Sequence, residues 1–292
     1  MREAIRHQLS ESLGRDICIA STCDVGGGCI NKAEVLILDD SARVFIKMND
    51  HPPAGMFEAE SKGLSLMKSA KGGPRVPAVI TCDDNSPARF LILDYLESTS
   101  PGKDYFPRFG RALASMHRTT EDTFGLDHDN FIGSTPQINN REKDGLIFFR
   151  DHRLGYQQEL ARKSGLLPKK VDQKLDALRA KLGDLLNLEN EQPALIHGDL
   201  WSGNHFCGPC GEATIFDPAA HFGLREADLA MTELFGRMPQ AFYDAYHEAF
   251  PLNPGYRERR DIYNLYHLLN HLNLFGGSYL GSVETTISQF TR

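Results

Sequence analysis

The chain has 292 residues and a formal net charge of −7, and 41% of its residues are hydrophobic. A chain of this length and composition can bury one large core or two smaller ones, which argues against a disordered protein. Its acidic balance disfavours nucleic acid or an anionic membrane surface as the main partner. Because the N-terminus lacks a signal-peptide pattern and no apolar run reaches the length of a membrane span, we expect a cytoplasmic protein.

The first third of the chain alternates between short apolar runs and turns. Ile5, Leu9 and Leu13 recur every four residues and predict a short amphipathic helix. A second helix is predicted between Pro53 and Gly72, two residues that are typical of helix boundaries. Strands are predicted at 17–20, 33–38, 44–48, 76–81 and 90–93.

Gly26, Gly27 and Gly28 lie between the first two predicted strands. Because glycine has no Cβ, backbone N–H groups of such a loop can approach a phosphate closely. The sequence therefore predicts a loop that covers phosphate groups. A plain flexible turn is the alternative.

Lys47 lies on the third predicted strand, and Glu60 lies on the helix that follows it. Glu60 shares the inward face of that helix with apolar residues three or four positions away. Since burying an unpaired carboxylate is costly, we predict that Glu60 pairs with Lys47. Glu58, on the other side of the same helix, is the alternative partner.

A turn-rich segment, Ser98 to Gly102, marks a boundary between two lobes. Beyond it the sequence is mainly helical, and the non-periodic segment 121–144 is predicted to be a long loop of the kind that often serves binding. His117 is interpreted as a packing histidine. Helices are predicted at 109–117, 146–163, 168–188, 225–234 and 254–278, with short strands at 195–196 and 213–216.

Six cysteines occur along the sequence, too few for a disulfide scaffold in a chain of this size, so we expect reduced thiols. Cys207 and Cys210 have the spacing of a metal-binding pair. A zinc ribbon needs a second such pair, which the sequence lacks. We therefore interpret Gly208-Pro209 as the turn of a hairpin.

The most informative motif for function runs from His197 to Asn204, with the sequence His-Gly-Asp-Leu-Trp-Ser-Gly-Asn. Phosphoryl transfer needs one carboxylate aimed at the acceptor hydroxyl and two oxygen ligands that hold Mg²⁺ on the phosphates of ATP. Asp199 and Asn204 keep the spacing of a kinase catalytic loop, and Asp217 follows a strand where kinases carry a metal-binding aspartate. The alternative is an aspartate-rich turn that merely joins two strands.

These residues, the Phe-Asp-Pro-Ala run at 216–219 and the segment from Leu269 to Gly276 resemble the fructosamine kinase family. That family is a branch of the protein-kinase-like fold, which also contains aminoglycoside and choline phosphotransferases. The resemblance covers nearly the whole chain. It implies an α+β, bilobal protein-kinase-like fold: a small antiparallel β-sheet N-lobe at 1–96 that binds the nucleotide, and a larger, mainly helical C-lobe at 97–292 that holds the acceptor.

The resemblance also implies roles for residues outside the catalytic motif. Lys47 would bind the phosphates of ATP, and backbone groups around Tyr95 and Leu96 would bind the adenine edge. Trp201 and His271 would line the sugar site.

Two further residues are implied to support the catalytic loop. Asp228 would accept its backbone N–H groups, with an ordinary acid at a helix N-terminus as the alternative, and His197 would also support it. The segment 130–139 is expected to border the acceptor pocket. Gly145 stands where the family has a tryptophan.

The implied function is the phosphorylation, dependent on ATP and Mg²⁺, of a ketoamine. In a ketoamine a sugar such as fructose or ribulose is joined to an amine of a small molecule or of a protein lysine. The 3-hydroxyl would be phosphorylated, and spontaneous breakdown of the product would then free the amine. One alternative is an aminoglycoside- or choline-type phosphotransferase. Another is a nucleotide-binding pseudokinase scaffold, disfavoured because no catalytic position is missing. The oligomeric state, monomer or dimer, is left open.

Cys29 lies at the edge of the glycine loop. Backbone N–H groups gathered there for phosphate would also favour its thiolate, the form that oxidants attack. We therefore expect oxidation of Cys29 to be coupled to nucleotide binding, through a bridge either to Cys23 or to a second chain. The alternative is a small residue tolerated in a tight loop.

Overall fold

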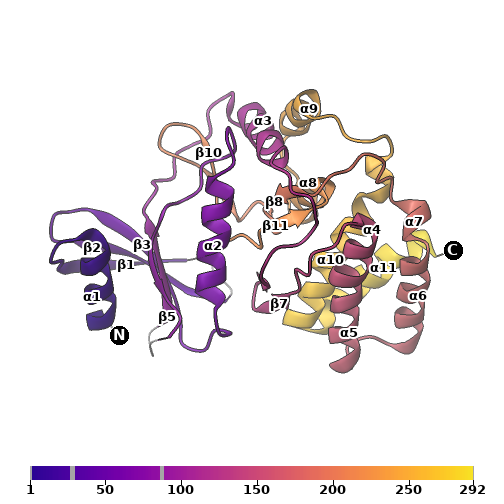
Figure 1. Ribbon diagram of the computed structural model, residues 1–292, viewed down its shortest axis with the longest axis horizontal. Coiled ribbons are helices and arrows are strands. Elements are labelled where there is room, and N and C mark those ends of the chain that lie inside the picture. The colour runs from indigo at the N-terminus through magenta and orange to yellow at the C-terminus, as the bar shows by residue number, and fades with distance from the viewer. Residues whose placement is uncertain (1, 27–29, 86–88, 292) are drawn as a thin grey trace.

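The computed structural model describes residues 2–26, 30–85 and 89–291. Figure 1 shows a sheet with two helices at one end of the molecule and a mainly helical part at the other. The α+β class expected from the sequence is confirmed, because a five-stranded antiparallel sheet is joined to many helices. The sheet end of the molecule contains α1 (Arg2–Leu13), β1 (Ile19–Val25), β2 (Lys32–Leu38), β3 (Arg43–Asn49), α2 (Met56–Lys68), β4 (Val79–Asp83) and β5 (Arg89–Asp94).

The five strands form one antiparallel sheet in the order β1-β2-β3-β5-β4, so β3 lies at its centre. Successive side chains of a strand point to opposite faces. Ile46 is therefore buried on the face that α1 covers, in one cluster with Leu9 and Phe90. Its neighbour Lys47 points to the other face, on which α2 packs (Figure 1).

Short strands and many helices make up the rest of the chain. Three pairs of short strands, β6–β7, β8–β11 and β9–β10, are each antiparallel. The elements are α3 (Tyr105–His117), β6 (Asn130–Ile132), β7 (Thr135–Gln137), α4 (Gly145–Ile147), a π-helix (Phe148–Gly155), α5 (Tyr156–Lys163), α6 (Lys169–Ala180), α7 (Leu182–Leu185), β8 (Ala194–Ile196), β9 (His205–Cys207), β10 (Ala213–Ile215), β11 (His221–Gly223), α8 (Arg225–Leu234), α9 (Gln240–Ala249), α10 (Tyr256–Phe275), a 3₁₀ helix (Gly277–Tyr279) and α11 (Leu280–Phe290).

One hydrophobic core runs across both ends of the molecule. Phe57 of α2 and Leu91 of β5 belong to the same buried cluster as Phe109 of α3 and Phe242 of α9. The rings of Phe109 and Phe242 lie 5.1 Å apart. A Cβ at Gly110 would collide with the backbone of Phe242, so glycine is needed for α3 and α9 to pack this closely.

A second core lies entirely within the helical part. It joins buried side chains of α5, α6, α8, α10 and α11. Tyr263 of α10 is fully enclosed there, and its ring meets that of Phe149 at 5.2 Å. This core fixes α10, which carries part of the candidate site described below.

The structure corrects several predicted boundaries in the helical part. The segment 121–144 is not a loop throughout, because β6 and β7 form a hairpin inside it. The helix expected at 146–163 contains a π-helical segment, and the one expected at 168–188 divides at Lys181 into α6 and α7. The hairpin was not predicted because three-residue strands are too short to show a period of two. The break at Lys181 was not predicted because an apolar stripe can continue across a helix break.

The bounds of two strands and of one helix also differ from the predicted ones. The first strand begins at Ile19 instead of 17, and β4 lies at Val79–Asp83 instead of 76–81. The last predicted helix ends at Phe275, because Gly276 has φ +83° and follows the helix as a terminating glycine. The sequence analysis missed both α9 and α11.

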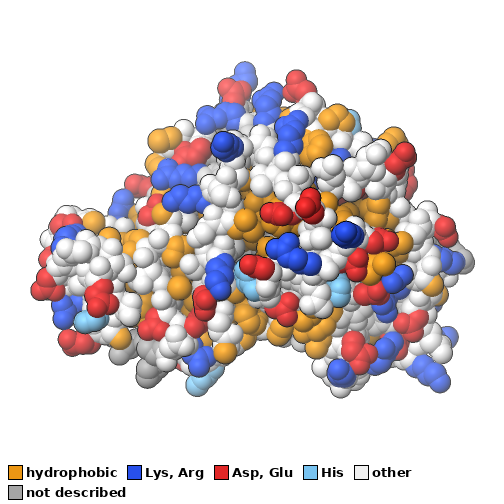
Figure 2. Space-filling model, in the orientation of Figure 1, with side chains coloured by type: hydrophobic (Ala, Val, Ile, Leu, Met, Phe, Trp, Pro, Cys, Tyr) orange, Lys and Arg blue, Asp and Glu red, His pale blue; other side chains and the backbone are white. Residues whose placement is uncertain are grey.

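The turn predicted between Cys207 and Cys210 is confirmed, since the hairpin of β9 and β10 closes there. Within the described residues no helix is long and apolar enough to cross a membrane. Figure 2 shows acidic and basic side chains interspersed over the visible face, without a large area of one sign.

Candidate active site

The loop from 197 to 204 joins β8 to β9 and begins with a tight turn. Gly198 has φ +81°, and a Cβ at this position would collide with the backbone oxygen of Ala219. Glycine alone fits a left-handed conformation with a neighbour so close. The Ala219 N–H donates to the His197 carbonyl oxygen at 2.9 Å, so this turn lies against the segment that follows Asp217.

Asp228, near the N-terminus of α8, anchors the same turn. Its carboxylate accepts the backbone N–H of His197 at 2.6 Å and that of Gly198 at 2.8 Å. His117 lies 3.2 Å from the same carboxylate and also bonds Tyr246 at 2.8 Å. Burial acts to raise the pKa of Asp228, but the His117 contact and the loop N–H hold that pKa below its usual value. A charged carboxylate can therefore fix the loop backbone.

His197 links the loop to the strand that leads to Asp217. Its Nδ1 accepts the Asp199 N–H at 3.2 Å, so its Nε2 carries the proton and donates to the Phe216 carbonyl at 2.8 Å. Burial lowers the pKa of His197, which agrees with a neutral ring. The backbones of Asp199 and Phe216 are thereby held in fixed positions.

Asp199 belongs to this loop, and 23% of its side chain is exposed. The Asn204 amide donates to the Asp199 carbonyl at 2.8 Å and to its carboxylate Oδ2 at 3.2 Å. Burial raises the pKa of Asp199 to about 7, while the bond from Asn204 acts to lower it. The other carboxylate oxygen, Oδ1, remains available to a substrate.

Charged side chains from both ends of the molecule meet here. Lys47 and Glu60 belong to the sheet end, and Asp217 follows β10. Lys47 Nζ lies 2.6 Å from Glu60 Oε1 and also pairs with the carboxylate of Asp217. Asp217 has φ +58°, an uncommon conformation for a residue with a side chain. Glu58, the alternative partner, pairs with Lys62 at 2.8 Å.

The donor atoms here suit a hard cation. Asn204 directs both amide hydrogens to Asp199, so its Oδ1 can act as a ligand, and the Asp217 side chain is 40% exposed. Mg²⁺ prefers such carboxylate and carbonyl oxygens together with phosphates. Among residues 2–26, 30–85 and 89–291, no group of three or more His, Cys, Asp or Glu could hold a metal.

Aromatic rings form a continuous group that begins at Trp201, two residues after Asp199. Trp201 meets Phe235 edge-on, with ring centroids 6.3 Å apart, and Phe235 lies 4.8 Å from His271. His271 in turn contacts Phe275 at 5.4 Å and Tyr279 at 5.0 Å. Trp201 and His271 were predicted from the sequence to line the sugar site, whereas no role was predicted for the other three rings.

His267 was missed as well. His267, His271 and Phe275 are four residues apart on α10 and so share one helix face. That spacing could have indicated the group. The His267 Nδ1 atom lies 3.9 Å from Asp199 Oδ1.

The segment 130–139 packs against the chain that follows Asp217. Asn130 donates to the Ala220 carbonyl at 2.8 Å, and Gln137 donates to the Ala219 carbonyl at 3.1 Å. Tyr266 of α10 donates to Gln137 at 2.6 Å. This segment therefore lies between the Asp217 region and α10.

The remaining residues predicted from the sequence are those for the adenine, the glycine loop and the redox-active cysteines. Tyr95 and Leu96 follow β5 and are half-buried, and the Arg43 guanidinium lies 4.5 Å from the Tyr95 ring centroid. Gly26 directly follows β1, whereas Gly27, Gly28 and Cys29 lie outside the described residues. Cys23 is exposed on β1, opposite Val35.

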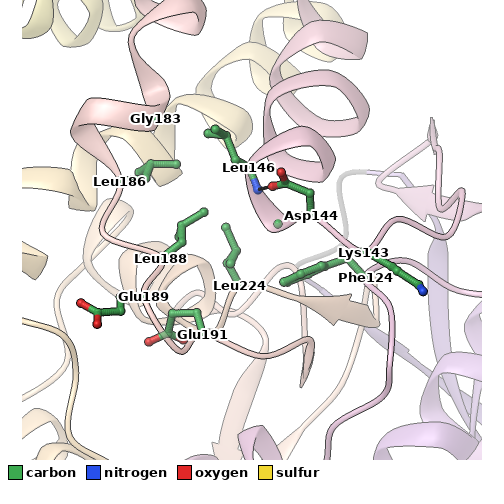
Figure 3. A pocket seen from close by; sticks show the side chains of 11 residues that line it. Phe124, Lys143, Asp144, Leu146, Gly183, Leu186, Leu188, Glu189, Glu191 and Leu224 are labelled. Atoms are coloured by element: carbon green, nitrogen blue, oxygen red, sulfur yellow. Dashed lines mark hydrogen bonds between the residues drawn. The ribbon is translucent and has the colours of Figure 1, made fainter.

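A cavity of about 400 Å³ lies apart from these residues, and none of the predicted site residues lines it. Figure 3 shows Leu146, Leu188 and Leu224 around it. Gly145, where the resemblance leads us to expect a tryptophan, is in its wall, and a Cβ there would approach the Phe124 ring to 2.8 Å.

The whole chain, residues 1–292, matches the family described as fructosamine kinase. A protein of Synechocystis sp. named "Probable ketoamine kinase" is 41% identical, over 99% of this chain and 97% of its own length. The "Protein-ribulosamine 3-kinase, chloroplastic" of Arabidopsis thaliana is 38% identical, over 96% of this chain and 85% of its own length.

Solved structures show the same fold. A "putative fructosamine-3-kinase" from Thermobifida fusca is 33% identical, with a TM-score of 0.87 over 98% of this chain and 97% of its own. An aminoglycoside phosphotransferase solved with AMP-PNP and hygromycin B is 14% identical, with a TM-score of 0.63 over 98% of both chains. At that identity the second similarity concerns the fold alone.

Proposed function

The chain belongs to the fructosamine kinase family, and on this basis we propose that it transfers the γ-phosphoryl group of ATP to the 3-hydroxyl of a ketoamine. Relatives named ketoamine kinase and protein-ribulosamine 3-kinase support this class of acceptor. The observation that carries the proposal is the arrangement around Asp199. Asn204 binds one oxygen of the Asp199 carboxylate, the other oxygen lies 3.9 Å from His267 Nδ1, and Trp201 follows two residues later in the same loop.

On the nucleotide side, Lys47 would bind the phosphates and Glu60 would hold Lys47 in place. Asn204 and Asp217 would hold Mg²⁺, which supplies positive charge to the phosphates when bound. Lys47 would exchange its pairing with Asp217 for one with a phosphate. We also assign the adenine to backbone groups near Tyr95 and Leu96 and the phosphate cover to Gly26, Gly27 and Gly28. Nucleotide binding is thus assigned to 1–96 and acceptor binding to 97–292.

On the acceptor side, Asp199 would accept the proton of the sugar hydroxyl as its oxygen bonds to the γ-phosphorus and ADP leaves. Burial helps here, because a carboxylate with a pKa of about 7 is a stronger base than an ordinary aspartate. His197 and Asp228 would act as structural support, since their hydrogen bonds fix the backbone of the loop and of Phe216. Sequence and function together favour the cytoplasm, although one plant relative is named chloroplastic.

Trp201 and His271 would form the wall against which the sugar lies. Aromatic rings present apolar faces to the C–H groups of a sugar ring, and Phe235 fixes both of them. The ketoamine could be a small molecule or a sugar on a protein lysine. Phe275 is 46% exposed at the edge of this wall and would meet the amine-bearing part.

A phosphate-transfer assay with labelled ATP and Mg²⁺ tests the proposal. The acceptors are a fructosamine, a ribulosamine, kanamycin and choline, and the Asp199→Asn variant is the control. We expect transfer to one or both ketoamines, followed by release of the free amine. Transfer to kanamycin or choline alone, or no transfer at all, would contradict the proposed function.

A further inference from the structure

His267 is a buried residue of α10 that the proposed mechanism does not yet use. Its side chain is 3% exposed, and its Nδ1 atom has no hydrogen-bond partner among the described residues. Buried polar atoms are normally paired, because an unpaired one loses its bond to water without replacement. The unpaired nitrogen therefore calls for a partner that the described residues do not supply.

One polar group close to this nitrogen is the carboxylate of Asp199. Its Oδ1 lies 3.9 Å from His267 Nδ1, which is too long for a direct hydrogen bond. Asn204 occupies Oδ2, so Oδ1 is the oxygen that can act as the base. One unpaired nitrogen and one basic oxygen thus lie side by side at the acceptor site.

Vicinal hydroxyl groups suit this pair of atoms. One hydroxyl can bond Asp199 Oδ1 while the neighbouring hydroxyl bonds His267 Nδ1, each with a hydrogen bond of about 2.8 Å. A hydroxyl can both donate and accept, so it satisfies a neutral imidazole in either tautomer. Burial lowers the pKa of His267 to about 3, so its ring is neutral.

We propose that His267 Nδ1 hydrogen-bonds the sugar hydroxyl next to the one that Asp199 activates, and so selects acceptors with a vicinal diol. This inference rests on the proposed function. If the 3-hydroxyl is phosphorylated, we assign the 4-hydroxyl to His267, because C2 is a carbonyl in the open-chain ketoamine. An acceptor that lacks this hydroxyl leaves the buried nitrogen unpaired and should be rejected.

Two acceptors and three variants test the inference. The acceptors are a fructosamine and its 4-deoxy analogue, prepared from glucose and 4-deoxyglucose with the same amine. His267→Leu removes the polar atom, whereas His267→Asn keeps one attached to the same side-chain carbon. His247→Leu, at an exposed position of α9, is the matched control. Melting temperatures show which variants remain folded.

For the natural enzyme we expect kcat/KM to be about 10- to 100-fold higher with the fructosamine than with its 4-deoxy analogue. His267→Leu should reduce that ratio to near one, mainly through KM, while His267→Asn and His247→Leu should retain most of it.

Equal rates of the natural enzyme with both acceptors would overturn the inference without any variant. Equal losses of His267→Leu on both acceptors would also overturn it, since His267 would then act on Asp199 or on the fold. Failure of the natural enzyme to phosphorylate any ketoamine would instead overturn the proposed function, and this inference with it.

Discussion

Lys47 Nζ lies 2.6 Å from Glu60 Oε1 and pairs at the same time with Asp217. One ammonium group therefore joins the central strand of the sheet, the helix that covers it and the segment that follows β10. Only 6% of the Lys47 side chain is exposed, so this pairing is largely shielded from solvent. Ion pairs of this kind are strongly coupled, because removing one partner leaves the other without its charge.

The first prediction concerns that coupling. Lys47→Met and Glu60→Gln should each lower kcat/KM, and the double variant should be little worse than Lys47→Met alone, because the two residues act as a unit. The measurement is a double-mutant cycle on kcat/KM for ATP. Glu58→Gln is the control, and it should have a small effect because Glu58 pairs with Lys62 at the surface. Strictly additive losses would show that Glu60 does not work through Lys47.

The second prediction concerns the base. Asp199→Asn keeps the shape and the contact with Asn204 but cannot accept a proton. We expect kcat to fall by roughly 10² or more while Mg-ATP still binds, because the lost interaction is made in the transition state. Turnover and nucleotide binding are measured on the same preparation. Near-normal turnover would reject Asp199 as the base.

The third prediction concerns pH. Burial raises the pKa of Asp199 to about 7, with Asn204 acting to lower it and Asp228 to raise it. A base works only when deprotonated, so kcat/KM for the acceptor should decline as the pH falls through about 7 and should level off above it. A pH profile of kcat/KM checks this. A decline that begins only near pH 4 would mean that Asp199 titrates as an ordinary aspartate.

The fourth prediction concerns the turn before Asp199. Gly198→Ala should reduce stability by about 1–3 kcal/mol and also lower kcat, since alanine is strained at positive φ and its Cβ would displace Ala219. Thermal unfolding and turnover are the measurements. Gly102→Ala is the control, because nothing lies within 4 Å of an added Cβ there. Equal behaviour of the two variants would contradict the prediction.

The fifth prediction concerns a buried ion pair of the helical part. Arg259 Nε donates to Glu226 at 2.5 Å, and both side chains are at most 3% exposed. Arg259→Met should cost about 3–5 kcal/mol of unfolding free energy, because it leaves Glu226 buried without its partner. Arg260→Met, at a partly exposed pair with Glu233, should cost about 1 kcal/mol or less. Urea unfolding compares the two variants.

Local periodicity was sufficient for much of the fold. The spacing of the second helix placed Glu60 on its inward face, and from this the sequence predicted that Glu60 pairs with Lys47, as the ion pair confirms. Both residues lie in regular elements, and apolar neighbours identify the inward face of such elements. The α+β class and the kinase-like similarity followed from motifs with fixed spacing, and both are confirmed.

What the sequence could not indicate depends on contacts between distant segments. The spacing of His267 and His271 places both on one helix face, but only the folded chain places the His267 Nδ1 atom near Asp199. Phe235 likewise carries no local signal, yet it joins Trp201 to His271. The π-helical segment at 148–155 has the same apolar spacing as an ordinary helix over so short a length.

The core shared by α2, β5, α3 and α9 limits how the protein can be divided. Phe57 and Leu91 bury their side chains in the same cluster as Phe109 and Phe242. A fragment that ends at residue 96 would expose that apolar surface to water and would tend to aggregate. Evolution could therefore exchange acceptor-binding loops on this scaffold more readily than it could exchange whole lobes.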